Sequence, residues 1–259
     1  MNEENLIKYY NKFNEDKRLY TRHGIVEFTT TIKYIEKYLK KFNNPKIIDI
    51  GAGCGRYSIY LNELGYDVVS VDLVKHNLKV IEKKNKNIKT ILANATNLSK
   101  INDNTFDIVL LFGPLYHLIT EEEKIKALDE AKRILKKDGI IMIQYCMSDY
   151  AIIKHGFMEN FIIKEINDKK ITSNFKLTPN TTDLYSMMNL NEIKLLNKKC
   201  NLKRIEIFSP DGPTDYIRKD VNNMSDDVFN KYLSYVYKIS KRKDLLGASS
   251  HVVDILKKI

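Results

Sequence analysis

The sequence has few cysteines, no long apolar run and no leader-like start. Its three cysteines, Cys54, Cys146 and Cys200, are far apart and odd in number. They form neither a disulfide framework nor a metal-ligand spacing, which is typical of a reducing compartment. No window of about eighteen residues is continuously apolar, so no transmembrane helix is predicted. The first residues, Met1-Asn2-Glu3-Glu4, lack a basic-then-apolar leader. We therefore expect a cytoplasmic protein with no membrane association and no metal.

The charge is basic overall but evenly mixed. Lys and Arg number 43 and Asp and Glu 33 among 259 residues, which gives a net charge of +10. A basic excess is compatible with a nucleic-acid surface. However, bases and acids are interspersed, as in Lys164-Glu165-Ile166-Asn167-Asp168-Lys169-Lys170, and no long basic stripe occurs. The charge therefore does not favour a nucleic-acid partner, and an RNA or protein substrate stays open as an alternative.

Strand and helix patterns alternate from residue 46 onward. Short apolar runs predict strands, and apolar residues at helical spacing predict helices. The predicted strands are 46–50, 67–71, 88–93, 106–112, 140–146, 202–208 and 250–256. The predicted helices are 3–20, 25–41, 56–64, 75–84, 121–135, 190–199 and 226–240, and Asp138-Gly139 is predicted to be a turn. This alternation predicts an α/β fold with a mostly parallel sheet and right-handed crossovers.

The same pattern suggests how the chain is divided. Residues 1–45 are predicted to form a helical N-terminal cap, and residues 46–259 the sheet domain. The alternation lapses near 147–188 and again near 211–246. Long excursions without regular structure are usually functional. We therefore expect these two insertions to form a lid over the site.

A glycine-rich loop, Gly51-Ala52-Gly53-Cys54-Gly55, lies between the first predicted strand and its helix. Such a loop lets the backbone approach a ligand closely, beyond the carboxyl end of a strand. A dinucleotide fingerprint needs glycine at the sixth position, where this chain has Arg56, and a P-loop needs Gly-Lys-Ser/Thr. Asp49, two residues before the loop, would repel a pyrophosphate and attract an ammonium group.

Polar residues at the next two strand ends complete a candidate ligand site. Asp72 ends the second strand, where a carboxylate can accept both hydroxyls of a ribose. Asn94 and Ala95 follow the third strand and could bond an adenine, the former with its side chain and the latter with its backbone N–H. Leu73 could pack on the purine. The predicted ligand has an adenine, a free ribose and an amino-acid cation.

Taken in order, these motifs resemble those of class I S-adenosylmethionine-dependent methyltransferases. The matching residues are Asp49-x-Gly-x-Gly-x-Gly55, Asp72, Asn94-Ala95, Phe106-Asp107-Ile108-Val109-Leu110, Gly113–Leu118 and Arg133–Gly139. Arg18, Glu27-Phe28, Gly55–Ser58 and Gly247–His251 are similar to a bacterial small-molecule branch of that family. The resemblance implies a Rossmann-like seven-stranded sheet with an antiparallel last strand. It also implies S-adenosylmethionine as the cofactor and S-adenosylhomocysteine as the product. Many relatives carry Asp where this chain has Asn94.

The residues after the fourth strand would face the reacting methyl group. They begin with Phe112 and continue as Gly113-Pro114-Leu115-Tyr116-His117. This segment lacks the Asp, Asn or Ser that adenine and cytosine amino-methylases place before Pro-Pro-aromatic. The chain also has no Pro-Cys pair, as carbon-5 cytosine methylases need, and no clustered acids here, as catechol-type metal enzymes need. We therefore expect methyl transfer to N, O or S of a small molecule. A protein that binds the cofactor without turnover is a further alternative.

Candidate residues for the acceptor side are histidine and tyrosines. His117 is a candidate general base, because its ordinary pKa near 6.5 allows proton acceptance at neutral pH, and Tyr116 is a candidate pocket residue. Four weaker substrate candidates are Tyr20, His23, Tyr145 and Tyr185. Arg18 or Arg22 could pair with the methionine carboxylate, and the chain is expected to be a monomer or homodimer.

Overall fold

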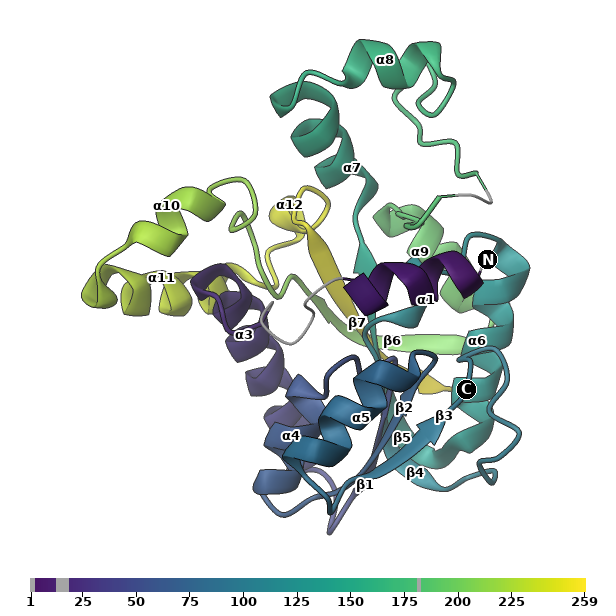
Figure 1. Cartoon of the computed structure of the whole chain (residues 1–259). Helices are drawn as coiled ribbons and strands as arrows, with labels where there is room; N and C mark the ends of the chain where they lie inside the picture. Colours follow the sequence, from purple (N-terminus) through teal and green to yellow (C-terminus); the bar gives the residue numbers. More distant parts are fainter. Residues whose placement is uncertain (1–2, 13–18, 181–182) are drawn as a thin grey trace.

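One seven-stranded sheet organises the protein (Figure 1). The computed structural model describes residues 3–12, 19–180 and 183–259. The strands are β1 (Lys46–Ile50), β2 (Asp67–Asp72), β3 (Lys89–Leu92), β4 (Phe106–Leu111), β5 (Leu135–Cys146), β6 (Leu202–Phe208) and β7 (His251–Lys258). Their order is β3-β2-β1-β4-β5-β7-β6, and only β7 runs antiparallel to its neighbours. The predicted Rossmann-like sheet with an antiparallel last strand is confirmed.

Helices cover both faces of this sheet. The main ones are α3 (Arg22–Leu39), α4 (Arg56–Glu63), α5 (Lys75–Lys84), α6 (Glu121–Ile134) and α9 (Leu190–Lys199). The last two begin at capping boxes, Thr120 with Glu123 and Asn189 with Glu192, which satisfy the free N–H groups of their first turns. All five predicted helices at these positions are present.

Alternation along the strands assigns the two cores. Ile47, Ile108 and Met142 pack with α3 and α4 on one face. Ile48 and Val109 pack with α6 and α9 on the other. Since successive side chains of a strand point to opposite faces, each polar residue inside a strand points into one of these two cores. The direction of its side chain decides whether it can reach the ligand site.

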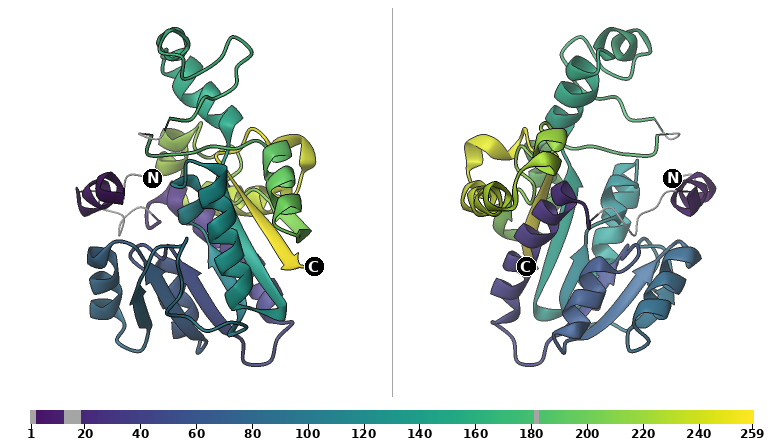
Figure 2. Two further views of the ribbon diagram at one scale, coloured as in Figure 1. Left: turned by 90° about the vertical axis from the view of Figure 1, so that its right-hand side faces the viewer. Right: turned by 60° about the vertical axis from the view of Figure 1, so that its left-hand side comes forward.

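The 147–188 insertion forms a lobe that projects beyond the carboxyl ends of the strands (Figure 2). It contains α7 (Ser148–Ala151), the π-helical η2 (Ile152–Met158) and α8 (Ile162–Asn167). The second insertion contains α10 (Arg218–Asn223), α11 (Asp226–Ile239) and α12 (Lys243–Leu246). Val221 and Phe229 of this insertion pack on Val26 of α3, so α10 and α11 extend the α3 side of the molecule.

Two local predictions need correction. The predicted turn at Asp138-Gly139 is wrong, because β5 starts at Leu135 and runs through it. The extra residues form an irregularity, since β4 pairs Phe106 with Leu135 and then Ile108 with Ile140. Gly139 allows this, because a Cβ there would lie 2.6 Å from Leu135 Cδ1. The predicted helix 3–20 is described as α1 (Glu3–Lys12), and residues 13–18 lie outside the described residues.

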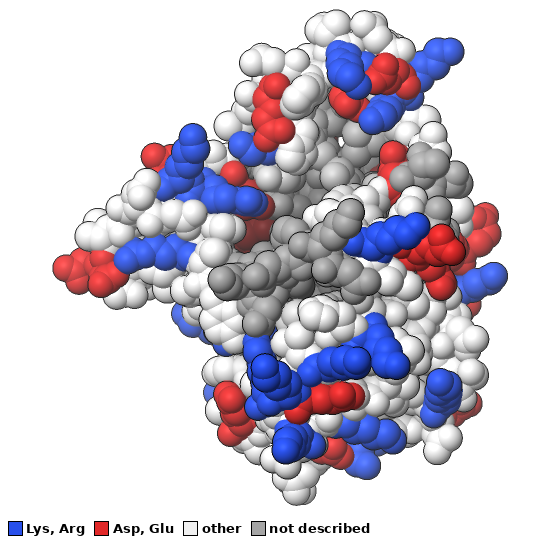
Figure 3. Space-filling model, viewed as in Figure 1, with Lys and Arg blue, Asp and Glu red and all other residues white. Residues whose placement is uncertain are grey.

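The described surface mixes charges of both signs. On the face shown in Figure 3, Lys and Arg side chains are interleaved with Asp and Glu over α5, α10 and α8. This agrees with the mixed charge pattern of the sequence. Within the described ranges, no helix combines the length and the apolar character needed to cross a membrane.

Candidate functional site

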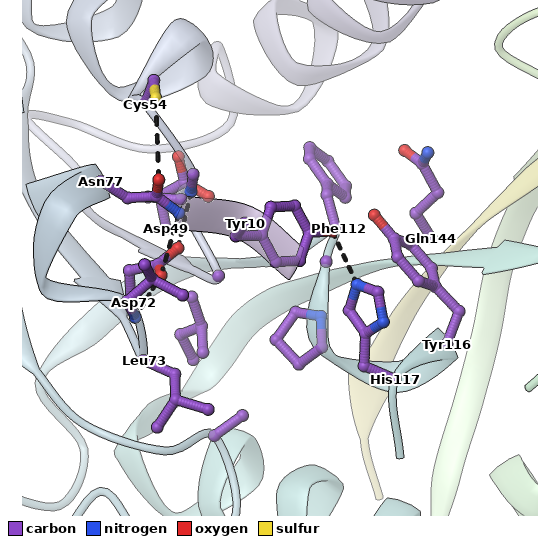
Figure 4. A pocket seen from close by; sticks show the side chains of 18 of the residues that line it. Tyr10, Asp49, Cys54, Asp72, Leu73, Asn77, Phe112, Tyr116, His117 and Gln144 are labelled. Carbon is purple, nitrogen blue, oxygen red and sulfur yellow. Dashed lines mark hydrogen bonds between the residues drawn. The ribbon is translucent and has the colours of Figure 1, made fainter. Parts of the chain in front are cut away.

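A pocket of about 1070 Å³, partly open to solvent, lies over the carboxyl ends of β1, β2, β4 and β5 (Figure 4). Its walls include nearly all of the residues predicted to hold the cofactor, together with both predicted acceptor-side residues of the loop after β4. Those predicted residues are Asp49, Gly51, Ala52, Gly53, Asp72, Leu73, Asn94, Ala95, Phe112, Tyr116 and His117. The topology therefore gathers segments more than sixty residues apart into one cleft.

The glycine loop is held by the strand beside it. Gly51 N–H donates to Val71 O at 2.8 Å, and Gly53 N–H donates to Asp72 Oδ2 at 2.8 Å. Gly51 has φ +75°, and a Cβ there would lie 2.5 Å from Pro114 Cδ. Gly55 is absent from the pocket wall, because it packs behind the loop against Ile81 as the N-cap of α4. Gly51 and Gly53 thus shape the floor, and Gly55 positions the helix.

Asp49 is a buried carboxyl at the floor of the pocket. Its Oδ2 accepts a hydrogen bond from Ser58 Oγ at 2.7 Å, and Ser58 Oγ accepts one from Ser70 Oγ at 2.8 Å. Burial raises the pKa of Asp49 to about 6, against the opposing effect of the Ser58 hydrogen bond. A cationic ligand would favour the ionised form of this group.

The residues predicted to hold adenosine follow β2 and β3. Asp72 Oδ1 accepts from Val74 N–H at 2.7 Å, so both of its oxygens are oriented by backbone donors. Leu73 and Ala95 line the same end of the pocket. Asn94 Oδ1 accepts from Thr96 N–H at 2.9 Å, and Asn94 Nδ2 donates to Glu3 of α1. The amide predicted to accept from adenine is thus already bonded within the chain.

His117 is buried and bonded at both ring nitrogens. Nδ1 lies 2.8 Å from Leu184 O, and Nε2 lies 2.7 Å from Tyr10 Oη of α1. Because a carbonyl only accepts, Nδ1 carries the proton and Nε2 accepts from Tyr10. Burial lowers the pKa of His117 to about 4, although the bond to Leu184 opposes this. Tyr116 and Tyr185 pack against the imidazole at ring-centroid distances of 4.7 and 5.0 Å.

The structure does not bring the other predicted substrate residues to the pocket wall. Tyr20 is half-exposed, and His23 bonds Asn222 and Thr21 at the start of α3. Tyr145 lies in the core on the α9 face, because it alternates with Gln144 along β5. Tyr185 sits behind His117, away from the wall.

The predicted arginines are also absent from the described wall of the pocket. Arg22 donates to Met224 O and to Asp226, on the surface beside α10. Arg18 lies outside the described residues.

Arg56, Glu27 and Gln144 are among the pocket residues that the sequence did not predict as site residues. The Arg56 guanidinium carbon lies 4.0 Å from the ring centroids of both Tyr20 and Phe28, and its Nε is buried without a hydrogen-bond partner among the described residues. Glu27 of α3 and Gln144 of β5 form the inner end of the pocket. Gln144 could have been noticed in the sequence, because it is the polar residue that follows the apolar run Ile140-Ile141-Met142-Ile143.

A second polar cluster stands near Glu27. Asp211, Asp215 and His251 place potential metal-binding atoms within 4.8 Å of one another. His251 Nδ1 donates to Asp211 Oδ2 at 2.6 Å, and Arg218 pairs with Asp215 at 2.7 Å. Burial opposes the charged imidazole, but Cys146 and Asp211 raise the pKa of His251 well above its usual value. The cluster is thus an ion-pair network in which two cations balance two carboxylates.

Comparison with known proteins gives a family match over the segment that contains the glycine loop, Asp72 and His117. The model of a family described as a methyltransferase domain matches residues 48–143. A glycine/sarcosine N-methyltransferase from Aphanothece halophytica is 32% identical over 130 residues, 48% of this chain and 49% of the relative. The chain spans about half the length of the curated relatives it matches.

Solved structures share the fold over nearly the whole chain. The PH0226 protein of Pyrococcus horikoshii superposes with a TM-score of 0.62 at 16% identity, over 97% of this chain and 99% of that one. A 1,6-didemethyltoxoflavin-N1-methyltransferase from Burkholderia thailandensis, solved with S-adenosylhomocysteine, gives 0.58 at 14% identity, over 97% and 85%. The family match, the loop geometry and the sheet order together identify residues 48–143 as a class I S-adenosylmethionine-dependent methyltransferase domain.

Proposed function

We propose that this protein transfers a methyl group from S-adenosylmethionine to a small molecule. The observation that supports it best is the order of pocket residues across the sheet. Leu73, Asn94 and Ala95 stand at β2 and β3, Asp49 and Gly51 at β1, and Phe112 and Tyr116 after β4. Adenine would then lie at β3, ribose at β2 and the methionine chain at β1, with the sulfonium methyl group turned toward the loop after β4.

We assign the methionine end to Asp49 and Arg56. Asp49 would attract the ammonium group, directly or through water, and the buried Nε of Arg56 offers a donor to the carboxylate. The rings of Tyr20 and Phe28 hold the guanidinium in place without using its hydrogens. Arg56 therefore replaces Arg18 and Arg22 as the proposed carboxylate partner.

Methyl transfer from a sulfonium needs alignment more than activation. The acceptor must lie in line with the breaking carbon–sulfur bond, and water must be kept out. Tyr116 and Phe112 would wall the acceptor side, while α1 closes the pocket from above through Leu6 and Tyr10. The bonds of Tyr10 to His117 and of Asn94 to Glu3 tie α1 to the loops after β4 and β3.

Calorimetry with S-adenosylmethionine and S-adenosylhomocysteine tests this proposal. We expect one site per chain for each, and release of S-adenosylhomocysteine when a metabolite extract is added. No binding of either compound would refute the proposal. Binding without release would instead support a cofactor-binding protein without turnover. Binding to bulk RNA that falls steeply with salt would favour the nucleic-acid alternative.

The raised pKa of Asp49 predicts pH-dependent cofactor binding. Since the ammonium favours the ionised carboxylate, affinity should rise as the pH rises through about 6 and level off above. One unit below that pKa, about nine tenths of the carboxyl groups are protonated, so affinity at pH 5 should be ~10-fold weaker than at pH 7.5. The stability of the unliganded protein should change with pH in the opposite direction to cofactor affinity. Because the Asp49 pKa is raised on folding, the free energy of unfolding should fall as the pH rises from about 4 to about 6.

The Asp49→Asn variant is the matched control for this effect. It should bind more weakly at pH 7.5 and lose the pH dependence over this range. A wild-type affinity that is flat with pH, or a slope that the variant keeps, would rule out Asp49 as the titrating group.

We propose that His117 positions α1 and does not act as a base. Its low pKa and its two bonds leave it neutral and engaged at pH 7. His117→Asn can keep the bond to Leu184 O, so its kcat should stay within about threefold of wild type. His117→Ala should mainly raise KM for the cofactor, and neither variant should shift the pH profile of kcat. A general base would instead cost ~10²–10⁴-fold in kcat in both variants.

A further inference from the structure

The inner end of the pocket is formed by two hydrogen-bonding side chains from separate elements. Gln144 comes from β5 and Glu27 from α3, and both line the cavity although they are only 1% and 5% exposed. Gln144 Nε2 donates to Glu27 Oε1 at 3.1 Å. Period-two alternation turns Gln144 to the α3 face, while its neighbour Tyr145 points to the opposite core.

This bond fixes the orientation of the Gln144 amide. With its nitrogen on Glu27, its oxygen Oε1 is buried and accepts no hydrogen bond from any described residue. A buried polar atom left unsatisfied costs ~1–3 kcal/mol, so such an atom in a ligand pocket indicates a donor on the ligand. Figure 4 shows the Gln144 amide at the end of the pocket beyond Phe112, away from Asp72 and Leu73.

The sheet order places this amide next to the reacting methyl group. β5 follows β4, whose loop carries Phe112 and Tyr116, and Leu111 of β4 pairs with Ile143 of β5. Gln144 is therefore one strand spacing, ~4.8 Å, beyond the strand assigned to the methyl group. That is where the acceptor must stand, on the side of the methyl group opposite sulfur.

We propose that the acceptor is a small primary or secondary amine, and that Gln144 Oε1 accepts one of its N–H groups. This inference rests on the proposed function of the same site. The neutral nitrogen uses its lone pair to form a bond to the methyl carbon while the carbon–sulfur bond breaks, and that electron pair goes to sulfur. The products are an N-methylammonium and the neutral thioether S-adenosylhomocysteine, and the ammonium then releases its proton to water.

Positive charge moves from sulfur to nitrogen during this step. The Glu27 carboxylate and the Gln144 amide oxygen would lie close to the nitrogen and stabilise its developing positive charge. They would therefore favour the transition state over the ground state. An oxygen or sulfur acceptor that reacts as an anion offers no hydrogen to Gln144 and would stand beside a carboxylate. The pair therefore selects an amine over a phenolate, thiolate or carboxylate.

Matched probes on the protein loaded with S-adenosylhomocysteine test the inference. Benzylamine, benzyl alcohol and benzoate share one ring and differ in the polar group, and their dissociation constants can be measured by ligand-observed NMR. We expect benzylamine to bind at least ~10-fold more tightly than either other probe, about one charged hydrogen bond. Gln144→Met, of similar volume but without an acceptor oxygen, should weaken benzylamine binding ~10-fold while keeping affinity for S-adenosylhomocysteine within threefold. Benzoate should bind weakly to both proteins, because Glu27 is unchanged.

Asn197 offers a control of the same chemistry away from the pocket. Its Oδ1 is also buried without a described partner, and its Nδ2 donates to Asp254 at 2.7 Å. Asn197→Leu should change thermal stability but keep the amine preference. Equal binding of the alcohol or benzoate, absence of benzylamine binding, or an unchanged benzylamine affinity in Gln144→Met would each overturn the inference. Failure to load S-adenosylhomocysteine would refute the proposed function itself, so the two failures are distinguishable.

Discussion

The Gly51→Ala variant is expected to bind S-adenosylmethionine at least ~100-fold more weakly than the wild type and to unfold at a lower temperature. Gly51 has φ +75°, where an L side chain costs ~1–2 kcal/mol. Its new Cβ would also lie 2.5 Å from Pro114 Cδ and 2.8 Å from Cγ. Either the glycine loop or the loop after β4 must then move, and both line the pocket. Calorimetry and thermal unfolding measure the two effects.

Gly65→Ala separates the backbone strain from the contact. Gly65 has φ +90°, but a Cβ there would meet nothing within 4 Å. This variant should lose ~1–2 kcal/mol of stability and keep the wild-type affinity. If Gly51→Ala bound the cofactor within threefold of wild type, the close packing of the two loops would not be needed for binding.

The Asp72→Ala variant should lower cofactor affinity by ~100-fold or more, since hydrogen bonds to a charged group contribute ~1.5–3 kcal/mol each. The carboxylate is assigned to the two ribose hydroxyls. It also accepts from the N–H groups of Gly53 and Val74. The variant would therefore remove one contact of the glycine loop and one of the segment after β2. The measurement is the dissociation constant for S-adenosylhomocysteine, which avoids turnover.

Asp67→Ala supplies the matched control on the same strand. Asp67 starts β2, at the end remote from the pocket, and its side chain is 62% exposed. The net charge changes by the same amount, but the affinity should stay within about twofold, because exposed ion pairs contribute ~0–1 kcal/mol. Equal losses in the two variants would mean that Asp72 acts through overall charge and not through the ribose.

The sequence was informative wherever local pattern determines structure. The positions of the seven strands followed from short apolar runs, and the glycine loop, Asp72 and Asn94 followed from their places at strand ends. These features depend on residues close in sequence and on one general rule, that ligands bind beyond the carboxyl ends of parallel strands. Asp138-Gly139, predicted to be a turn, lies instead within β5, at the irregularity where the register with β4 shifts from Leu135 to Ile140.

The acceptor side depended on contacts that local pattern does not contain. Gln144 gained its place only because α3, more than a hundred residues earlier, covers that face of β5 and brings Glu27 against it. Tyr145, one of the four weaker substrate candidates from the sequence, points to the opposite core because successive side chains of a strand alternate. His117 lies in the pocket, as expected, but burial lowers its pKa to about 4, and Tyr10 occupies its second ring nitrogen.

We propose that the ligand lies across the sheet with adenine at β3, ribose at β2, methionine at β1 and the sulfonium methyl group facing the loop after β4. The most direct measurement is a crystal structure of the protein with S-adenosylhomocysteine. We predict the ribose hydroxyls on Asp72, the amino group toward Asp49, the carboxylate on Arg56, and the sulfur facing Tyr116 and Gln144. A nucleoside bound in the reverse direction, or density outside this pocket, would refute this placement of the ligand.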